Sequence, residues 1–192
     1  MVQVKHFIKQ WLRHPKKVGA VMPSSRRLAR LITDTPHLRQ ASAVVEIGPG
    51  TGAFTTSILE QKRPDALFLA VELNGTFVQM LKHRHPGVEF YHDSAAHVQT
   101  YLRKHGRETC DCIICGMPWG IFDETLQRSL LAAICDVLEP GGEISTFAYL
   151  GGPWLKPGRR FKRMLPEYFS KVTVSRMIWM NMPPAFVYRC VK

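Results

Sequence analysis

The sequence predicts an α/β fold in which a doubly wound, mostly parallel, seven-stranded Rossmann-like sheet ends in an antiparallel β-hairpin. Three observations predict this fold. Apolar runs alternate with stretches of helical periodicity, a three-glycine loop follows the first run, and two β-type runs flank a proline-rich turn near the C-terminus. A chain of 192 residues with 45% hydrophobic content is long enough for one such domain, and we expect no second substrate domain.

The elements follow from these patterns in chain order. Apolar runs place five parallel strands near residues 43–47, 67–72, 88–91, 111–115 and 143–149. Helical stretches between them are predicted at 53–62, 75–84, 95–105 and 123–138. Two further β-type runs, at 171–179 and 185–191, surround Asn181-Met182-Pro183-Pro184 and predict the terminal hairpin.

The loop after the first strand is the most informative motif of the chain. Its sequence is Val45-Glu46-Ile47-Gly48-Pro49-Gly50-Thr51-Gly52. Glycine permits a tight turn and lets the backbone approach a ligand to contact distance, which a Cβ would prevent. Such a loop, between a strand that ends on an acid and a helix, predicts a cradle for a nucleoside cofactor.

Acids at the ends of the next two strands narrow the class of cofactor. Glu72 closes the second run and lies 20 residues past Gly52, about the spacing at which an acid meets a ribose. The pair Asp93-Ser94 ends the third run. These acids, together with the terminal hairpin, favour an S-adenosylmethionine methyltransferase. The alternative is a dinucleotide-binding enzyme, because Gly48-x-Gly50-x-x-Ala53 also satisfies the dinucleotide pattern, with alanine in place of the third glycine. Ordinary strand-to-helix turns explain Asp93 alone more easily than they explain the whole set.

Positive charge is concentrated in two segments of the chain. The formal net charge is +11, yet residues 1–33 hold eight Lys or Arg and no acid, and residues 156–163 hold five and no acid. The rest of the chain carries a formal charge of −2. Such patches predict an anionic partner, either nucleic acid or an anionic lipid surface. The alternative is that they are solvated surface charge.

The five cysteines do not predict a metal site. In a strand Cys112 and Cys115 would point to opposite faces, and no paired His or second Cys-x-x-Cys completes a tetrahedral set. We therefore expect free, buried thiols in a reducing cytoplasm.

No apolar run reaches the roughly 18 residues that predict a membrane span, and the N-terminus lacks the features of a signal peptide.

The first residues form a predicted amphipathic helix that Pro15 ends. Its apolar face comprises Val4, Phe7, Ile8, Trp11 and Leu12, and its basic face comprises Lys5, Lys9 and Arg13. A basic helix with Trp and Phe on its apolar face is typical of helices that lie flat in a membrane interface, where each cation contributes about 1 kcal/mol. Packing of this face on the sheet of the protein itself is the alternative. After it, Ser24-Ser25 offers a cap to a second helix that begins at Arg26.

After the fourth strand the chain reads Gly116-Met117-Pro118-Trp119. Many amino-methyltransferases carry Asn/Asp-Pro-Pro-Tyr at this place, where the first side chain accepts from a planar amine. Gly116 has no side-chain acceptor, so an aliphatic amine is favoured over a nucleobase. Trp119 is predicted to form an aromatic wall, because methylated ammonium gains roughly 0.5–2 kcal/mol from cation–π attraction. The alternative for Trp119 is a core aromatic.

Together these motifs resemble those of the soluble bacterial phospholipid N-methyltransferases. The matching segments are Phe7-Ile8-x-x-Trp11-Leu12-x-x-Pro15-x-x-Val18-Gly19-Ala20-Val21-Met22-Pro23-Ser24-Ser25, Glu46–Gly52, Val71–Asn74, Gly116–Trp119 and Thr146–Tyr149. Members of that family methylate phosphatidylethanolamine stepwise to phosphatidylcholine with S-adenosylmethionine. The resemblance spans nearly the whole chain, and its N-terminal run is the most specific part. Met117, where leucine is expected, is a modest departure.

The resemblance implies a cofactor site and a membrane-binding first helix. The residues implied to line S-adenosylmethionine are Pro23, Ser24, Glu46, Gly48, Gly50, Thr51, Gly52, Glu72, Leu73, Asp93, Ser94 and Gly116. On this basis residues 1–33 form a membrane-interacting helical segment and residues 34–192 form the methyltransferase domain. We expect a cytoplasmic protein that associates peripherally with anionic phospholipid through the first helix.

The predicted mechanism is that of an interfacial methyltransferase. The sulfonium methyl is already activated, so the protein mainly aligns the amine nitrogen, and alignment can contribute about 7–11 kcal/mol. Tyr149, at the end of the fifth strand, and Trp119 are predicted to orient the amine; no general base can be named. The cations Lys156, Arg159, Arg160, Lys162 and Arg163 are expected either to bind lipid phosphate or to form an exposed helix face.

Other acceptors and classes of protein stay open. An ornithine lipid or another aminolipid is the alternative acceptor. An RNA adenine dimethyltransferase shares the glycine loop and suits the charge, but Gly116 and the expected lack of an appended RNA-binding domain disfavour it. A non-catalytic membrane-binding module would keep the first helix but would need neither Glu72 nor the glycines. We expect no nucleic-acid or protein partner and no metal.

Overall fold

The computed structural model describes residues 24–152 and 155–192. Its centre is a seven-stranded sheet of order β3-β2-β1-β4-β5-β7-β6. The strands are β1 (Ala43–Ile47), β2 (Leu67–Glu72), β3 (Glu89–His92), β4 (Cys110–Cys115), β5 (Leu138–Tyr149), β6 (Lys171–Val174) and β7 (Ala185–Val191). Strands β1 to β5 pair in parallel, and β7 runs antiparallel between β5 and β6. The predicted fold class is therefore confirmed.

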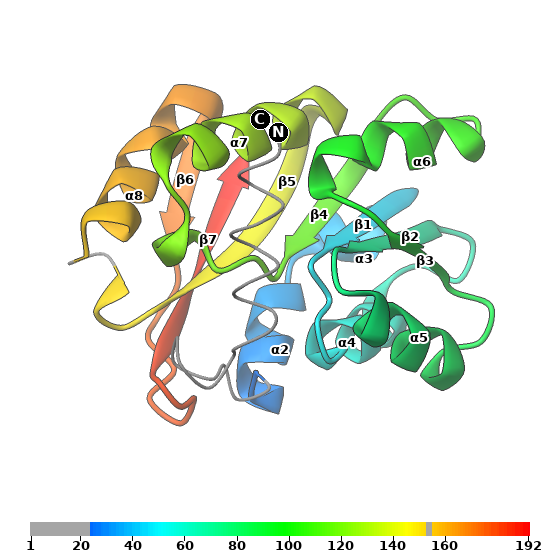
Figure 1. The fold of residues 1–192 in the computed structure, drawn as a ribbon, viewed down its shortest axis with the longest axis horizontal. Helices are drawn as coiled ribbons and strands as arrows, with labels where there is room; N and C mark the ends of the chain where they lie inside the picture. The colour runs from blue at the N-terminus through cyan, green and yellow to red at the C-terminus, as the bar shows by residue number, and fades with distance from the viewer. Residues whose placement is uncertain (1–23, 153–154) are drawn as a thin grey trace.

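Helices cover both faces of this sheet (Figure 1). One face carries α2 (Arg26–Thr33), α3 (Pro36–Gln40), α4 (Ala53–Gln61) and α5 (Gly75–Arg84). The other face carries α6 (Val98–Lys104), α7 (Glu124–Val137) and α8 (Lys156–Tyr168). Short 3₁₀ turns, η1 (Ala95–His97) and η2 (Trp119–Ile121), lead into α6 and α7. The result is the three-layer arrangement of a doubly wound domain.

The central strands are buried on both faces, which explains their continuous apolar sequences. Every residue of β1 is buried, and β4 is buried at all but one position. Side chains alternate between two hydrophobic clusters, so that Cys112 packs toward α2 and α4 whereas Cys115 packs toward α7. The prediction that these two cysteines point to opposite faces is confirmed.

Side-chain caps fix where several helices begin. The Ser25 hydroxyl accepts from the Leu28 amide at 3.2 Å, as predicted, and the Asp123 carboxylate accepts from the Leu126 amide at 2.8 Å. Leu28 and Ile32 of α2 are fully buried in the cluster shared with α4. Residues 24–33, predicted as part of a separate N-terminal segment, thus pack into the main core. The predicted first helix lies outside the described residues.

The start of β5 and the end of β6 differ most from the prediction, for identifiable reasons, whereas the bounds of β3 and the start of β4 differ by one residue. β5 begins at Leu138, because a register shift between Cys110 and Cys112 lets β4 pair with β5 on both sides of an irregularity in the ladder. β6 ends at Val174, because the Ser175 hydroxyl rather than a backbone carbonyl accepts from the Val187 amide at 2.9 Å. Within the described ranges, no helix has the length and apolarity to cross a bilayer.

Candidate active site

The predicted cofactor residues at the ends of β1, β2, β3 and β4 lie at the carboxyl edge of the parallel strands. β1 pairs with β2 on one side and with β4 on the other. The strands that follow β1 are therefore added first on one side of it and then, from β4 on, on the other side. A crevice opens at such a switch point in doubly wound sheets. Backbone hydrogen bonds join the strand ends there: the Gly48 amide donates to Val71 and the Gly116 amide donates to Ile47, at 2.9 and 2.8 Å.

The glycine loop has the backbone shape that its sequence predicts. Gly48, Gly50 and Gly52 have φ angles of 68°, 56° and 84°, in the left-handed region that other residues rarely adopt. Gly52 also forms the N-cap of α4, so the loop leads directly into that helix. Arg84 of α5 donates to the Thr51 carbonyl at 2.8 Å and holds the outer side of the loop. The loop is therefore a preformed backbone cradle at a helix N-terminus.

Glu72 fixes the loop against the end of β2. One carboxylate oxygen accepts from the Gly50 amide at 2.9 Å, and the other accepts from the Asn74 amide at 2.8 Å. The side chain is largely buried, and burial raises the pKa of Glu72 although both amides oppose this rise. Each oxygen has a further lone pair, so the carboxylate can accept two hydroxyl groups, as a ribose requires.

Glu46 is a buried carboxyl group with one unused oxygen. The Thr55 hydroxyl donates to Oε2 at 2.6 Å, whereas Oε1 has no donor among the residues that the structure describes. Burial raises the pKa of Glu46 to about 8, and the bond from Thr55 opposes the rise. A buried acceptor without a partner, two residues ahead of Gly48 in the glycine loop, fits a cationic donor such as the ammonium at the amino-acid end of S-adenosylmethionine.

Asp93 holds β3 to the helix that follows it. Its Oδ1 accepts from the Ser94 amide at 2.7 Å and lies 2.9 Å from His97 Nδ1, and its Oδ2 accepts from the Tyr101 hydroxyl at 2.6 Å. Burial pulls the pKa of Asp93 upward, but these hydrogen bonds outweigh burial and lower it overall. The Asp93 backbone amide donates to the Glu72 carbonyl at 3.1 Å, which places both acids at one edge.

Smaller contributions surround these acids. The Ser94 hydroxyl caps η1 by accepting from the Ala96 amide at 3.3 Å, and the Leu73 carbonyl lies 3.1 Å from His92 Nε2. Ser24 is half-buried just ahead of α2, and Pro23 lies outside the described residues. Sequence reasoning missed Thr55, whose only signal is its place in the first turn after the glycine loop.

The structure explains why a glycine is needed at position 116, which the sequence alone does not show. A Cβ on Gly116 would overlap the Gly48 carbonyl oxygen, and Gly48 in turn lies against Met117. The loop after β4 thus rests directly on the glycine loop after β1. Gly116 itself can therefore offer only its backbone carbonyl as a hydrogen-bond acceptor.

Trp119 is buried, which favours the core alternative for this residue over the predicted aromatic wall. Only 2% of its surface is exposed. Its ring stacks on Phe161 at 4.4 Å between centroids, and its indole N–H donates to the Thr146 hydroxyl at 3.0 Å. Thr146 donates in turn to the Cys115 carbonyl. Trp119 therefore braces the ends of β4 and β5 through a stacked and hydrogen-bonded contact.

Tyr149 is half-buried at the end of β5, at the same edge as the acids. Its ring packs edge-on against Phe147 at 5.2 Å between centroids. Burial raises the pKa of Tyr149 to about 12, so its hydroxyl keeps its proton at neutral pH and can orient an amine without acting as a phenolate base.

Of the basic run in α8, Arg160 is engaged in the fold, because it donates to Gln127 Oε1 and to the Phe122 carbonyl, each at 3.0 Å.

The fold and this edge define a class I methyltransferase. Residues 44–142 match the family described as "Methyltransferase domain", and the chain belongs to that family. Its cofactor is S-adenosylmethionine, which is present in the solved O-methyltransferase TomG from Streptomyces achromogenes. TomG is 20% identical with a TM-score of 0.69, over 93% of this chain and 86% of TomG.

Two curated relatives differ in how much of the chain they match. An ornithine lipid N-methyltransferase from Singulisphaera acidiphila is 27% identical over 96% of this chain and 93% of its own length. Ribosomal RNA small subunit methyltransferase A from Chlorobaculum tepidum is 35% identical, but over only 41% of this chain and 27% of its own length. The similarity to the lipid enzyme thus spans nearly the whole chain, and the similarity to the RNA enzyme spans less than half.

Proposed function

We propose that the protein transfers methyl groups from S-adenosylmethionine to the aliphatic amine of a membrane aminolipid at the membrane surface. Phosphatidylethanolamine, with its mono- and dimethyl forms, is the acceptor we propose first, and phosphatidylcholine would be the final product. The observation that carries the proposal is the contact of Gly116 with the Gly48 carbonyl, which leaves no room for a side-chain acceptor at that position. A planar nucleobase amine is poorly served there, whereas an aliphatic amine needs only carbonyl oxygens.

The residues of the chain hold and align the reactants. S-adenosylmethionine supplies a methyl group that its sulfonium charge already activates. Glu72 and the glycine loop would hold the nucleoside, and Glu46 would accept from the ammonium at its amino-acid end. Tyr149 would orient the acceptor amine from the end of β5. Alignment of this kind can lower a barrier by about 7–11 kcal/mol, so no strong general base is needed.

An ornithine lipid is the second candidate acceptor. It is favoured by the name of the Singulisphaera acidiphila relative, whose match covers 96% of this chain. Both candidate lipids present an aliphatic primary amine, so the features around Gly116 and Tyr149 serve either headgroup. The two lipids differ in the anionic group near that amine, a phosphate in one and a carboxylate in the other.

The test is methyl transfer from labelled S-adenosylmethionine in mixed anionic vesicles. One set of vesicles contains phosphatidylethanolamine, a second contains ornithine lipid, and a third sample contains ribosomal RNA without lipid. We expect label in lipid and none in RNA, with the ratio of the first two rates naming the preferred headgroup. Label in RNA alone would refute the proposed function.

A further inference from the structure

The connection between β6 and β7, called here the hairpin loop (residues 175–184), lies at the same edge of the sheet as the candidate active site. β5 runs parallel to β4, and its last residue, Tyr149, pairs with Ala185 at the start of antiparallel β7. The hairpin loop therefore projects from the carboxyl edge next to Tyr149. Figure 1 shows this loop at the end of the sheet beside α2.

The hairpin loop exposes large apolar side chains. Trp179, Met180 and Met182 are 70%, 67% and 72% exposed, and they are three of the six large hydrophobic residues that are exposed in the described part of the chain. Two others, Leu150 and Leu155, follow β5 and flank the same edge. The hairpin loop contains no acidic residue. Large apolar side chains gathered at one exposed place mark an interaction surface.

The exposure of these side chains is imposed by the fold. Asn181, between the exposed methionines, is buried, and its side-chain oxygen accepts from the Ser25 amide at 3.0 Å. Its side-chain nitrogen donates to the Pro183 carbonyl at 2.7 Å. The Pro184 carbonyl accepts from the Leu150 amide at 2.6 Å and ties the base of the loop to β5. These hydrogen bonds hold the loop in a shape that leaves Met180 and Met182, on either side of Asn181, exposed.

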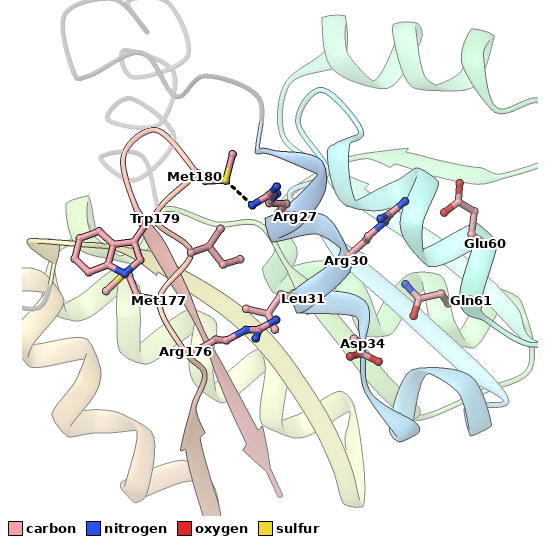
Figure 2. A pocket seen from close by; sticks show the side chains of 11 residues that line it. Arg27, Arg30, Leu31, Asp34, Glu60, Gln61, Arg176, Met177, Trp179 and Met180 are labelled. Carbon is pink, nitrogen blue, oxygen red and sulfur yellow. Dashed lines mark hydrogen bonds between the residues drawn. The ribbon is translucent and has the colours of Figure 1, made fainter.

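Cations accompany the apolar tip. A groove of about 980 Å³ separates α2 from the hairpin loop and is lined in part by Arg27, Arg30, Asp34, Glu60, Arg176 and Trp179. Arg27 contacts the Met180 sulfur, and Arg30 lies one turn further along α2 (Figure 2). Both acids lie on the far side of the groove from Trp179. The described lining thus carries three arginines against two acids, and Arg27 and Arg176 are the cations beside the loop.

We infer that the hairpin loop inserts Trp179, Met180 and Met182 into the interface of an anionic bilayer. The inference rests on the proposed function, since it gives the acceptor lipid a short path to Tyr149. Trp and Met suit the boundary between headgroups and acyl chains, and Arg27 and Arg176 suit lipid phosphates. The fixed loop enters the bilayer without having to order itself first. This surface is distinct from the predicted first helix and consists of described residues only.

The experiment compares two charge-matched variants of the full chain. Trp179→Glu with Met182→Glu places two acids on the loop, and Thr100→Glu with Ala132→Glu places two acids on exposed positions of α6 and α7. Both are floated with vesicles of phosphatidylethanolamine and phosphatidylglycerol. We expect the loop variant to partition about tenfold more weakly and the control within about twofold of the parent. Equal partition of the loop variant and the parent overturns the inference.

Further readouts separate this inference from neighbouring explanations. If the glutamates prevent folding, judged by S-adenosylmethionine binding, the neutral pair Trp179→Gln with Met182→Gln takes their place. The loop variant should methylate a short-chain, monomeric aminolipid at the parental rate and vesicles about tenfold more slowly. A parent that methylates no lipid, yet partitions through the loop, sinks the proposed function alone. If the parent self-associates in sedimentation and the loop variant does not, while both partition equally to vesicles, the surface binds a second copy of the chain. That result refutes the inference.

Discussion

The two halves of the carboxyl edge present their side chains in opposite ways. On the β1–β3 side, Glu46 and Glu72 are buried acids held by short hydrogen bonds to Thr55 and to backbone amides. On the β5–β7 side, Trp179 is an apolar residue that the fold keeps in solvent. The first half is a closed polar cradle, and the second is an open apolar rim.

The difference teaches how one sheet can serve a small polar ligand and a large apolar one. A nucleoside is bound by groups of fixed position, because charge-assisted hydrogen bonds need good geometry. A lipid surface has no fixed groups, so the matching half offers exposed area and cations. Tyr149 lies at the end of β5 between the two halves. Each prediction below perturbs one half and asks whether the other responds.

The largest expected effect is on cofactor binding by Glu72→Ala. Loss of the carboxylate removes two charge-assisted hydrogen bonds to a ribose, worth about 1.5–3 kcal/mol each, and leaves the Gly50 amide without its acceptor. We expect calorimetry to show a Kd for S-adenosylmethionine raised at least a hundredfold. Glu89→Ala, an exposed acid on β3, should bind normally. An unchanged Kd in folded Glu72→Ala would remove Glu72 from the site.

Substitution of a buried and of an exposed tryptophan, Trp119 and Trp179, should affect stability very differently. Trp119→Ala removes a buried, stacked ring and should lower the free energy of unfolding by about 3–5 kcal/mol in urea. Trp179→Ala, the exposed counterpart, should change it by less than about 0.5 kcal/mol. In Trp119→Phe the ratio of mono-, di- and trimethylated lipid should stay constant. Accumulation of monomethyl product in that variant would return Trp119 to the acceptor pocket.

Gly116→Asn tests the contact between the two loops that meet at β1 and β4. The new side chain would collide with the Gly48 carbonyl, and overpacking of this kind typically costs about 1–3 kcal/mol. We expect a lower midpoint of thermal unfolding and weaker S-adenosylmethionine binding. Gly120→Asn is the matched control, because no atom of the described residues other than its chain neighbours lies within 4 Å of a Cβ there. Equal behaviour of both variants would show that Gly116 leaves room for a side-chain acceptor.

The cradle half could be predicted from sequence because its determinants are local. β1 was predicted at 43–47 and is found at Ala43–Ile47, and α5 is found at the predicted 75–84. The spacing from the glycine loop to Glu72 predicted a shared site, and the hydrogen bond from the Gly50 amide confirms that the two meet. Strand runs, glycines with positive φ and strand-end acids each leave a mark within a few residues.

The rim half could not be predicted, because its determinants join distant segments. Asn181 holds the hairpin loop through Ser25, 156 residues away in the chain. The periodicity of 171–179 favoured a long strand, but Ser175 ends it by substituting its hydroxyl for a backbone partner. An aromatic after β4 fits a pocket wall as well as a core, and only the packing of Trp119 on Phe161 distinguishes them.

The last predicted effect is a pH dependence of cofactor binding, which we expect for the cradle half and not for the rim half. Burial raises the pKa of Glu46 to about 8, and the ammonium of S-adenosylmethionine favours its ionised form. Binding below pH 8 therefore releases a proton, so the Kd should rise as the pH falls, by at most about tenfold per pH unit down to pH 6. Glu46→Gln should flatten this dependence and bind weakly throughout, whereas the vesicle partition of both proteins should show no such step near pH 8. A calorimetric Kd that is constant from pH 6 to 8 in the parent would contradict a role for Glu46 in holding the ammonium.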